Sequence, residues 1–208
     1  NWLPPDNYQE YPAPVIASRT SPTNIGMSLL ADLSAYDFGY ICAGEFLQRA
    51  GNTLATMEKL ERYRGHFYNW YDTRNLKPLL PQYVSSVDSG NLAGCLLTLQ
   101  AGLAELKDQP VLPANAFQGL QDTLQVLVEQ LPTSAPSDLA KKLTLLQAAL
   151  TPSDPPRTLT DADRVLNVIQ RIGGGLVTWL PAEIDSDAEL YDWAQAFDQQ
   201  FRALRDDL

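Results

Sequence analysis

The stretch GHFYNWYDTRNLKPLLPQYVSSVDSGNL, residues 65–92, lies between two segments of helical pattern and resembles neither of them. It lacks the alternation of apolar and polar residues that a strand requires, and it is too aromatic for a simple spacer. A connection of about 20 residues without regular structure is uncommon in a compact domain and usually has a function. We therefore predict that this stretch is the substrate-facing edge of a helical domain.

Helical periodicity surrounds this stretch on both sides. Apolar residues recur at helical spacing and predict four helices, at residues 22–38, 43–63, 91–106 and 114–130. The first and third are almost uncharged, so we expect them to be buried on most sides, whereas the second and fourth are apolar on one side only. This alternation favours an inner and an outer ring of helices over a simple bundle, in which every helix would be one-sided. The fold class is therefore all-α.

The sequence patterns at the two ends of the chain differ from the pattern of this helical region. Residues 1–22 contain prolines that forbid a regular helix, which predicts an irregular N-terminal arm. From residue 132 onward, proline-rich loops separate shorter helices, so we divide the chain into domains 1–131 and 132–208. The C-terminal helices are expected at residues 137–150, at 160–179 with a break at Gly173–Gly175, and at 186–208. The best candidate for a strand is residues 83–87.

Composition excludes several classes of partner. The chain has 208 residues, of which 45% are hydrophobic, so it can bury a core. Its net charge of -10 argues against binding to nucleic acid, which needs clustered Lys and Arg, and against an anionic membrane surface. No apolar run reaches 18 residues, so we expect no direct membrane contact. A neutral ligand such as a sugar is compatible with this charge.

Metal and cofactor chemistry finds no support in the sequence. Cys42 and Cys95 are far apart and form no CxxC pair, so we expect two buried thiols in a reducing compartment. The single histidine, His66, has two interpretations: a loop histidine bonded to a backbone carbonyl, or a catalytic base. One histidine and two separate cysteines cannot build a common metal site, and no phosphate-binding glycine motif occurs. We therefore expect no metal and no cofactor.

Aromatic residues are concentrated within residues 67–71, where four of the five positions are aromatic, including Trp70 and Tyr71. A flat aromatic face suits the C–H side of a sugar ring, and planar polar groups suit its hydroxyls. We therefore predict that Trp70 and Tyr71 bind substrate. The alternative is that the aromatic cluster attaches the loop to the core.

Polar candidates follow the aromatic cluster. Asp72 comes directly after it, and Ser85, Asp88 and Asn91 lie close to the start of the third predicted helix. A carboxylate at a helix N-terminus is stabilised by the helix dipole and by free N–H groups. We predict that these four residues bind ligand hydroxyls beside the aromatic rings. Asp88 has a second interpretation, in which it only caps the helix.

A second polar set lies around the start of the first predicted helix and includes Arg19 and Asn24. If the first and third helices both belong to an inner ring, their N-terminal ends open on the same side. Residues 19–24 and 85–91 then lie at one rim, and Arg19 and Asn24 join the predicted substrate-binding residues.

Five motifs resemble the central region of the cyclic β-1,2-glucan synthases, which are very large bacterial inner-membrane enzymes. They are WLPPDNYQE at 2–10, RTSPTNIG at 19–26, LATMEKLER at 54–62, GHFYNWYDT at 65–73 and YVSSVDSGNLAG at 83–94. The resemblance is dense over residues 1–106. It implies that residues 1–131 are the N-terminal part of a glucoamylase-like (α/α)6 toroid, here represented by helical hairpins, and that residues 132–208 are a helical extension.

The resemblance also implies a function. The parent binds β-1,2-glucan and carries out a cyclising transglycosylation, and this region would lie on the cytoplasmic side of the bacterial inner membrane beside the remaining domains of the parent. The catalytic carboxylates of the family lie mostly downstream of these motifs, so Asp72 and Asp88 are candidates for substrate contacts before they are candidates for a catalytic pair.

Two other interpretations stay open. One is a structural helical module within a large membrane synthase that touches no sugar itself, and the other is a free-standing helical interaction domain. A large exposed apolar face on the first and third predicted helices would favour a domain that lacks its partner half.

Overall fold

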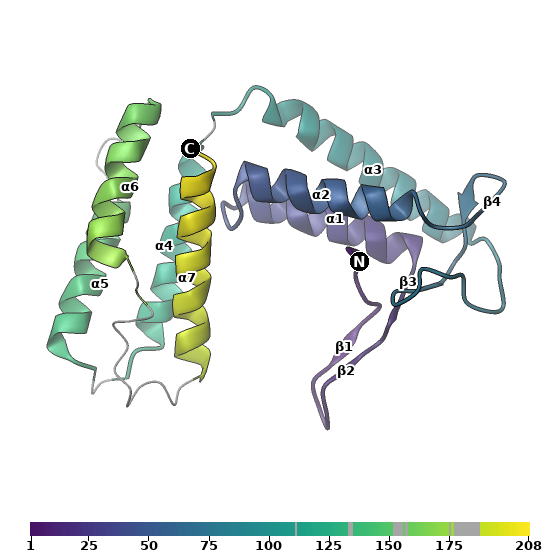
Figure 1. Cartoon of the computed structure of the whole chain (residues 1–208), viewed down its shortest axis with the longest axis horizontal. Coiled ribbons are helices and arrows are strands. Elements are labelled where there is room, and N and C mark those ends of the chain that lie inside the picture. The colour runs from purple at the N-terminus through teal and green to yellow at the C-terminus, as the bar shows by residue number, and fades with distance from the viewer. Residues whose placement is uncertain (111, 133–134, 152–155, 157, 175, 177–187) are drawn as a thin grey trace. The chain divides into compact units, whose positions relative to one another are not determined.

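A computed structural model of the chain describes residues 1–110, 112–132, 135–151, 156, 158–174, 176 and 188–208. Over these residues the structure is mostly helical with a few two-residue strands, so the all-α class is confirmed (Figure 1). The helices are α1 (Pro22–Asp37), α2 (Ala43–Met57), α3 (Ser86–Leu106), α4 (Ala114–Glu129), α5 (Ser137–Leu150), α6 (Leu159–Gly173) and α7 (Ala188–Asp206). The strands are β1 (Tyr8–Gln9), β2 (Val15–Ile16), β3 (Arg19–Thr20), β4 (Arg62–Tyr63), β5 (His66–Phe67) and β6 (Tyr71–Asp72).

The chain divides into two compact units. Unit 1 contains residues 1–34 and 46–109, and unit 2 contains residues 35–45 and 110–208. Helix α4 therefore groups with α5, α6 and α7, and its closest packing is against α7 and α5. The division of the chain into domains 1–131 and 132–208 stays a prediction.

In unit 1, α1 packs closely against α3 at a glycine. A Cβ atom added to Gly26 would lie 2.9 Å from both Cβ and Sγ of Cys95. Real Cβ contacts are essentially never that short, so only glycine permits this approach without a shift. The buried apolar residues follow helical spacing on both helices. They are Ile25, Leu29 and Leu33 on α1, and Leu92, Cys95 and Leu99 on α3.

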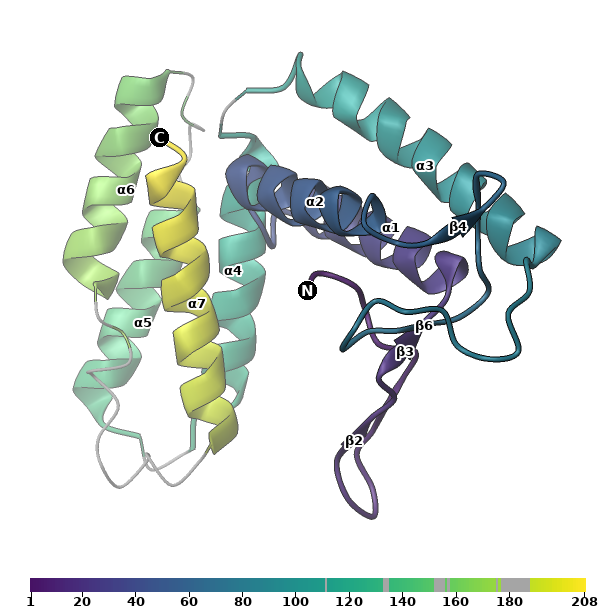
Figure 2. The same cartoon turned by 45° about the vertical axis from the view of Figure 1, so that its right-hand side comes forward.

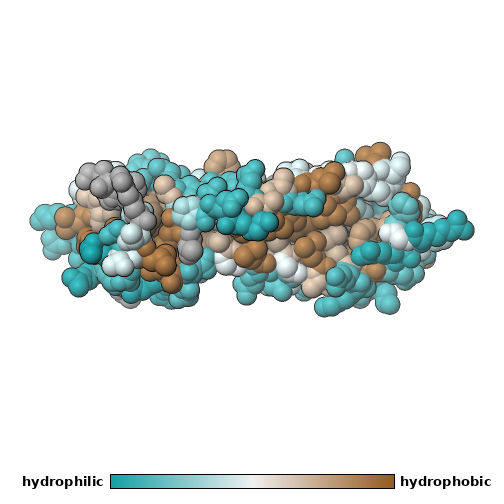
Figure 3. Space-filling view, turned by 90° about the horizontal axis from the view of Figure 1, so that it is seen from above, coloured by the Kyte–Doolittle hydropathy of each residue, from teal (hydrophilic) through white to brown (hydrophobic). Residues whose placement is uncertain are grey.

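The predicted burial of α3 on most sides is wrong for the described residues. Leu97 is 67% exposed and Val87 is 70% exposed, and α1 also exposes Met27. Figure 3 shows apolar side chains gathered on the face that carries α3. The stripe at Leu92, Cys95 and Leu99 contacts the rest of unit 1, and no described segment of this unit covers the opposite face. Although α3 carries almost no charge, it is therefore not buried on most sides.

Three local predictions around the long connection are also wrong. Helix α2 ends at Met57 and not near residue 63, because the chain turns and forms the β4–β5 hairpin. Arg64 (φ 51°) and Gly65 (φ 88°) at its tip adopt left-handed conformations that suit a tight hairpin turn. The strand candidate at 83–87 is not a strand, because α3 begins at Ser86, five residues before the expected start.

The N-terminal arm is irregular, as predicted, and includes the β1–β2 hairpin. Figure 1 and Figure 2 both show this hairpin projecting from the helices of unit 1. Further along, β3 pairs with β6, which attaches the end of the arm to the long connection.

Unit 2 has a continuous apolar core formed mainly by α4, α5, α6 and α7. Gly39 and Gly119 bring the loop after α1 against α4, since a Cβ added to Gly119 would lie 2.1 Å from the Gly39 carbonyl oxygen. That carbonyl also accepts a 2.9 Å hydrogen bond from Gln200 on α7. The predicted helical break near Gly173 is confirmed, because α6 ends there, and the predicted continuation across residues 177–179 lies outside the described residues.

Candidate functional site

Two long-range links bring the predicted substrate-binding residues of unit 1 together. The β3–β6 pairing places Arg19 opposite Asp72 and Thr20 opposite Tyr71. The N-terminal turns of α1 and α3 meet through Thr23, whose hydroxyl donates a 2.7 Å hydrogen bond to Asp88 Oδ1. Residues 19–24 and 85–91 therefore lie at one place, which we call the rim. It comprises Arg19, Asn24, Trp70, Ser85, Asp88 and Asn91.

Asp88 is the centre of the hydrogen bonds at the α3 end of the rim. Ser85 is the N-cap of α3, and its Oγ accepts the Asp88 backbone N–H at 3.1 Å. Asn91 Nδ2 donates to Thr23 Oγ1 at 3.1 Å, so it joins the same network. Burial raises the pKa of the Asp88 carboxyl, but hydrogen bonds from Ser85, Thr23 and Ser21 outweigh burial and hold this pKa below its ordinary value. Asp88 is thus a carboxylate in the first turn of α3, and Ser85 is the cap.

Asn69 connects Asp88 to the aromatic residues. Its hydrogen-bonding partners determine the orientation of its side-chain amide. The amide nitrogen donates to Asp88 Oδ2 at 2.8 Å, and the amide oxygen accepts from the Tyr83 hydroxyl at 2.7 Å and from the Trp70 indole N–H. Asn69 is buried. Because its amide bonds to both residues, it links the Trp70 ring to the carboxylate of Asp88.

Arg19 and Asp6 form the other end of the rim. Arg19 donates to Asp6 Oδ2 through Nη2 at 2.9 Å and through Nε at 3.1 Å. Asn24 Nδ2 donates to the second oxygen of the same carboxylate at 3.1 Å. The Arg19 guanidinium also lies 4.8 Å from the centre of the Trp70 ring, a cation–π distance. Asp6 therefore holds Arg19 beside Asn24, and Arg19 in turn contacts the Trp70 ring.

Tyr71 and Asp72 occupy different surroundings from the rim residues. Tyr71 is fully buried, and its hydroxyl accepts the Tyr68 backbone N–H at 2.8 Å and donates to the Glu61 carbonyl at 2.7 Å. Burial raises the pKa of this hydroxyl to about 12. Asp72 is also buried, and Arg74 binds both of its carboxylate oxygens, at 3.0 and 2.6 Å. Both side chains therefore stabilise the long connection that carries Trp70.

The structure adds residues that the sequence did not single out. Asp6, Thr23, Asn69 and Tyr83 complete the hydrogen-bonding network of the rim. Asp6 and Thr23 both lie within the motifs of residues 2–10 and 19–26, so those motifs were the available signal. Nothing in local spacing indicates that Asp6 would meet Arg19, because the contact spans a hairpin.

Both cysteines of the chain lie outside the rim. Cys42 and Cys95 are free and buried in the part of the chain that the structure describes, which confirms the expectation of two buried thiols. Burial raises the pKa of the Cys42 thiol to about 11. In the described parts of the chain, no three His, Cys, Asp or Glu side chains gather as a metal site would require. No helix among the described residues has both the length and the apolarity to cross a membrane.

Comparison with proteins of known function finds similarity to a segment of a cyclic β-glucan synthase, which confirms the resemblance predicted from the motifs. Over 132 residues, this chain is 48% identical to the cyclic beta-(1,2)-glucan synthase NdvB of Rhizobium meliloti (strain 1021). The match covers 63% of this chain and 5% of that relative, so the chain spans only a small part of the relative's length. No protein-family model matches the chain.

Proposed function

We propose that this chain is a segment of a cyclic β-1,2-glucan synthase and that its rim binds β-1,2-glucan. In this proposal the segment holds glucan for a cyclising transglycosylation, and the catalytic carboxylates belong to other parts of the parent. The 48% identity to a cyclic beta-(1,2)-glucan synthase supports the substrate class. The observation that carries the site is the gathering of one tryptophan with guanidinium, amide and carboxylate groups at the rim.

Each rim group has a role that sugar chemistry requires. The Trp70 ring is half-buried and fixed by Arg19 and Asn69, so it offers a pre-oriented apolar surface to the C–H face of a glucose ring. Asp88 is held in its charged form, so it accepts hydrogen bonds from sugar hydroxyls. Arg19, Asn24 and Asn91 supply donors. Tyr71 and Asp72 contribute by holding the connection in place, and Ser85 by beginning α3.

The wider context is part of the same proposal. The helical pairs belong to an (α/α)6 toroid of the parent on the cytoplasmic side of the inner membrane. Exposed apolar side chains on α1 and α3, such as Met27 and Leu97, support contact between this face and the remaining domains of the parent. Residues 1–131 would then be the toroid part and residues 132–208 a helical extension.

A second function has one observation in its favour. At the rim, Asp6 accepts hydrogen bonds from Arg19 and Asn24, and Asp88 accepts hydrogen bonds from Asn69 and Thr23. A network whose members satisfy each other can simply join α1, α3 and the long connection. The alternative is therefore a structural helical module of the synthase with no sugar contact of its own.

Glucan titration separates these two functions. Tryptophan fluorescence and calorimetry are recorded while linear β-1,2-gluco-oligosaccharides are added to the 208-residue chain. The binding function predicts saturable binding that Trp70→Ala weakens by about tenfold or more, equivalent to about 1.4 kcal/mol. Trp2→Ala is the matched control, because Trp2 is an exposed tryptophan of the same unit outside the rim. Absence of any response from a folded protein would favour the structural module.

A further inference from the structure

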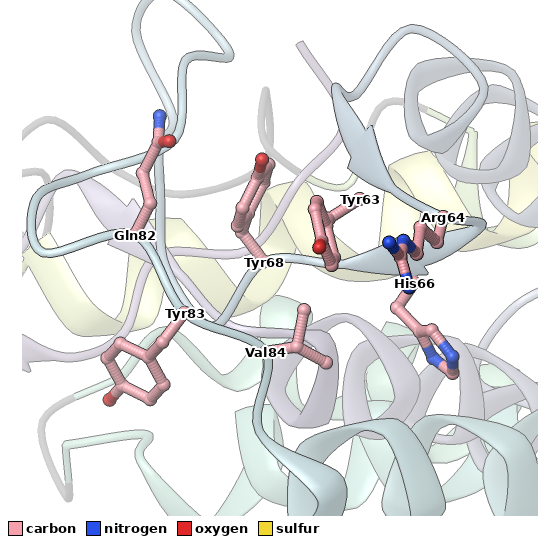
Figure 4. A pocket seen from close by; sticks show the side chains of 7 residues that line it. All are labelled: Tyr63, Arg64, His66, Tyr68, Gln82, Tyr83 and Val84. Atoms are coloured by element: carbon pink, nitrogen blue, oxygen red, sulfur yellow. The ribbon is translucent and has the colours of Figure 1, made fainter.

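A cavity in unit 1 lies beside the β4–β5 hairpin, and none of the six rim residues lines it. Its volume is about 510 Å³, within the range of small-ligand pockets. Figure 4 shows that its walls come from the hairpin, from Tyr68 just after it, and from residues 82–84. The lining residues are Tyr63, Arg64, His66, Tyr68, Gln82, Tyr83 and Val84. We call this cavity the hairpin pocket.

Contacts outside the cavity hold the β4–β5 hairpin and Tyr68, which form part of the pocket wall. Arg62 lies 4.3 Å from the centre of the Phe67 ring, which couples the two strands of the hairpin through a cation–π contact. The buried Tyr71 hydroxyl links the Glu61 carbonyl to the Tyr68 backbone N–H. The Tyr68 ring also packs edge-on against the Tyr71 ring, with centroids 6.5 Å apart. Tyr68 is therefore a positioned aromatic surface.

The polar groups of the hairpin pocket differ from those of the rim in one respect. Among the described residues, no side-chain hydrogen bond or ion pair engages Arg64, His66 or Gln82, whereas the rim groups engage one another. The Arg64 guanidinium lies 5.4 Å from the centre of the Tyr63 ring, so donor groups adjoin an aromatic surface. Within the described parts of the chain, no carboxylate lines the pocket. Its hydrogen-bonding capacity is thus available to a ligand without breaking existing bonds.

This combination has a specific ligand preference. Aromatic rings contact the C–H face of a pyranose, and guanidinium, amide and imidazole groups reach its hydroxyl and ring oxygens from the side. We propose that the hairpin pocket is a second carbohydrate subsite, which binds a glucosyl unit independently of the rim. The proposal rests on the proposed function, because it takes β-1,2-glucan as the ligand.

Tyr83 connects the rim network with the hairpin pocket. Its hydroxyl donates to Asn69 at 2.7 Å in the rim network, while the residue also lines the hairpin pocket. In Figure 4 the Tyr83 ring points away from the rings of Tyr63 and Tyr68. Tyr83 therefore belongs to both sites.

The chain contains natural reporters that distinguish the two sites. His66 is its single histidine and lines the hairpin pocket, so imidazole NMR signals report this pocket. The Trp70 indole signal reports the rim and is assigned by comparison with Trp70→Phe. We expect both signals to shift during titration of the isotope-labelled 208-residue chain with linear β-1,2-gluco-oligosaccharides at constant pH.

The outcomes of this titration distinguish glucan binding at the rim from glucan binding in the hairpin pocket. A shift of Trp70 without a shift of His66 overturns the hairpin pocket and leaves the rim intact. A shift of His66 without one of Trp70 supports the pocket and overturns glucan binding at the rim. If neither signal moves, both claims fail.

Two variants that each remove one positive charge from unit 1 provide the matched comparison. Arg64→Gln should abolish the His66 shift and weaken oligosaccharide binding by about tenfold, whereas Lys59→Gln, at an exposed position outside the pocket, should keep the shift. Circular dichroism and the Trp70 signal verify that both variants fold. Equal effects of the two variants, or an unchanged His66 shift in Arg64→Gln, would overturn the proposal.

Discussion

The Thr23 hydroxyl donates a 2.7 Å hydrogen bond to the carboxylate of Asp88, and so joins the first turn of α1 to the first turn of α3. The two residues are 65 positions apart in the chain. Both helices begin beside the rim, so this bond fixes where Ser85, Asp88 and Asn91 stand relative to Asn24. The rim depends on this pairing more than on any local motif.

Replacing Thr23 by Val should destabilise unit 1 measurably. The substitution preserves shape, but it removes the side-chain hydrogen bond to Asp88 Oδ1 and the acceptor of the Asn91 Nδ2 hydrogen bond. We expect a loss of about 1–3 kcal/mol in the free energy of unfolding, measured by urea denaturation. Thr98→Val is the control, because Thr98 is exposed and bonds only to Gly94 of its own helix, and its change should stay within about 0.5 kcal/mol. Equal losses would contradict the role of the pairing.

Two glycines in helices should respond to alanine in opposite directions. A methyl group at Gly26 would lie 2.9 Å from Cys95, so Gly26→Ala should destabilise the chain by about 1–3 kcal/mol. Gly51 in α2 has open space around the added atom, so Gly51→Ala should stabilise it by about 0.5–1 kcal/mol. Thermal unfolding followed at 222 nm, in the usual helical band, compares the two variants with the unmodified chain. Stabilisation by Gly26→Ala would argue against the close α1–α3 packing.

Asp72 should make stability depend on pH in the acid range. Hydrogen bonds from Arg74 lower the pKa of Asp72 from 3.8 to about 2. A lowered carboxyl pKa contributes stability that is fully present above the unfolded-state value and is lost as pH falls through the folded-state value. The stability difference between the unmodified chain and Asp72→Asn should therefore be largest above pH 3.8 and shrink toward pH 2.

Urea titrations across this interval provide the measurement. Arg74→Gln is the companion variant. It should remove part of the pH-dependent stability that Asp72 contributes. The rest should remain, because the backbone N–H groups of residues 74 and 75 still donate to Asp72. Because the Arg74 side chain is 75% exposed, solvent screens the pair and its contribution is modest. A pH-independent difference between Asp72→Asn and the unmodified chain would contradict the assignment.

The Cys42 thiol should be unreactive in the folded chain. It is 8% exposed, and burial raises its pKa to about 11, so little thiolate exists near neutral pH. In the Cys95→Ala variant, Ellman's reagent should therefore react slowly with the native protein and rapidly after unfolding. The unmodified chain should release two equivalents on unfolding without a reductant, because both cysteines are free. A single equivalent or none would indicate oxidation.

Much of the helical pattern could be predicted from the sequence, because apolar spacing is a local property. The predicted helix at 137–150 coincides with α5, and the starts of α1, α2 and α4 also agree. The start of α3 was missed because residues 83–87 look like a strand by composition. Ser85, three residues before Asp88, was the available signal, since an N-cap hydroxyl binds the N–H of the third helical residue.

Some residues of the candidate site could be predicted from the sequence, and others could not. The sequence indicated Trp70, Arg19, Asn24 and Asp88 as residues of one rim, and the structure brings these residues together. It did not indicate Asp6 or Asn69, which make the contacts between them. The site role of these residues stays a prediction until glucan binding is measured.

By itself, the sequence determined the all-α class, most helix positions and the resemblance to cyclic glucan synthases, because each rests on spacing or motifs within short segments. Only the tertiary structure decided that Tyr71 is buried as a support, that α3 exposes much of its apolar surface, and that a pocket with free polar groups lies at Tyr63–Arg64 and Gln82–Val84. The physical reason is that burial and hydrogen-bonding partners depend on segments far apart in the chain. Local periodicity fixes which side of a helix is apolar, and packing decides what, if anything, covers it.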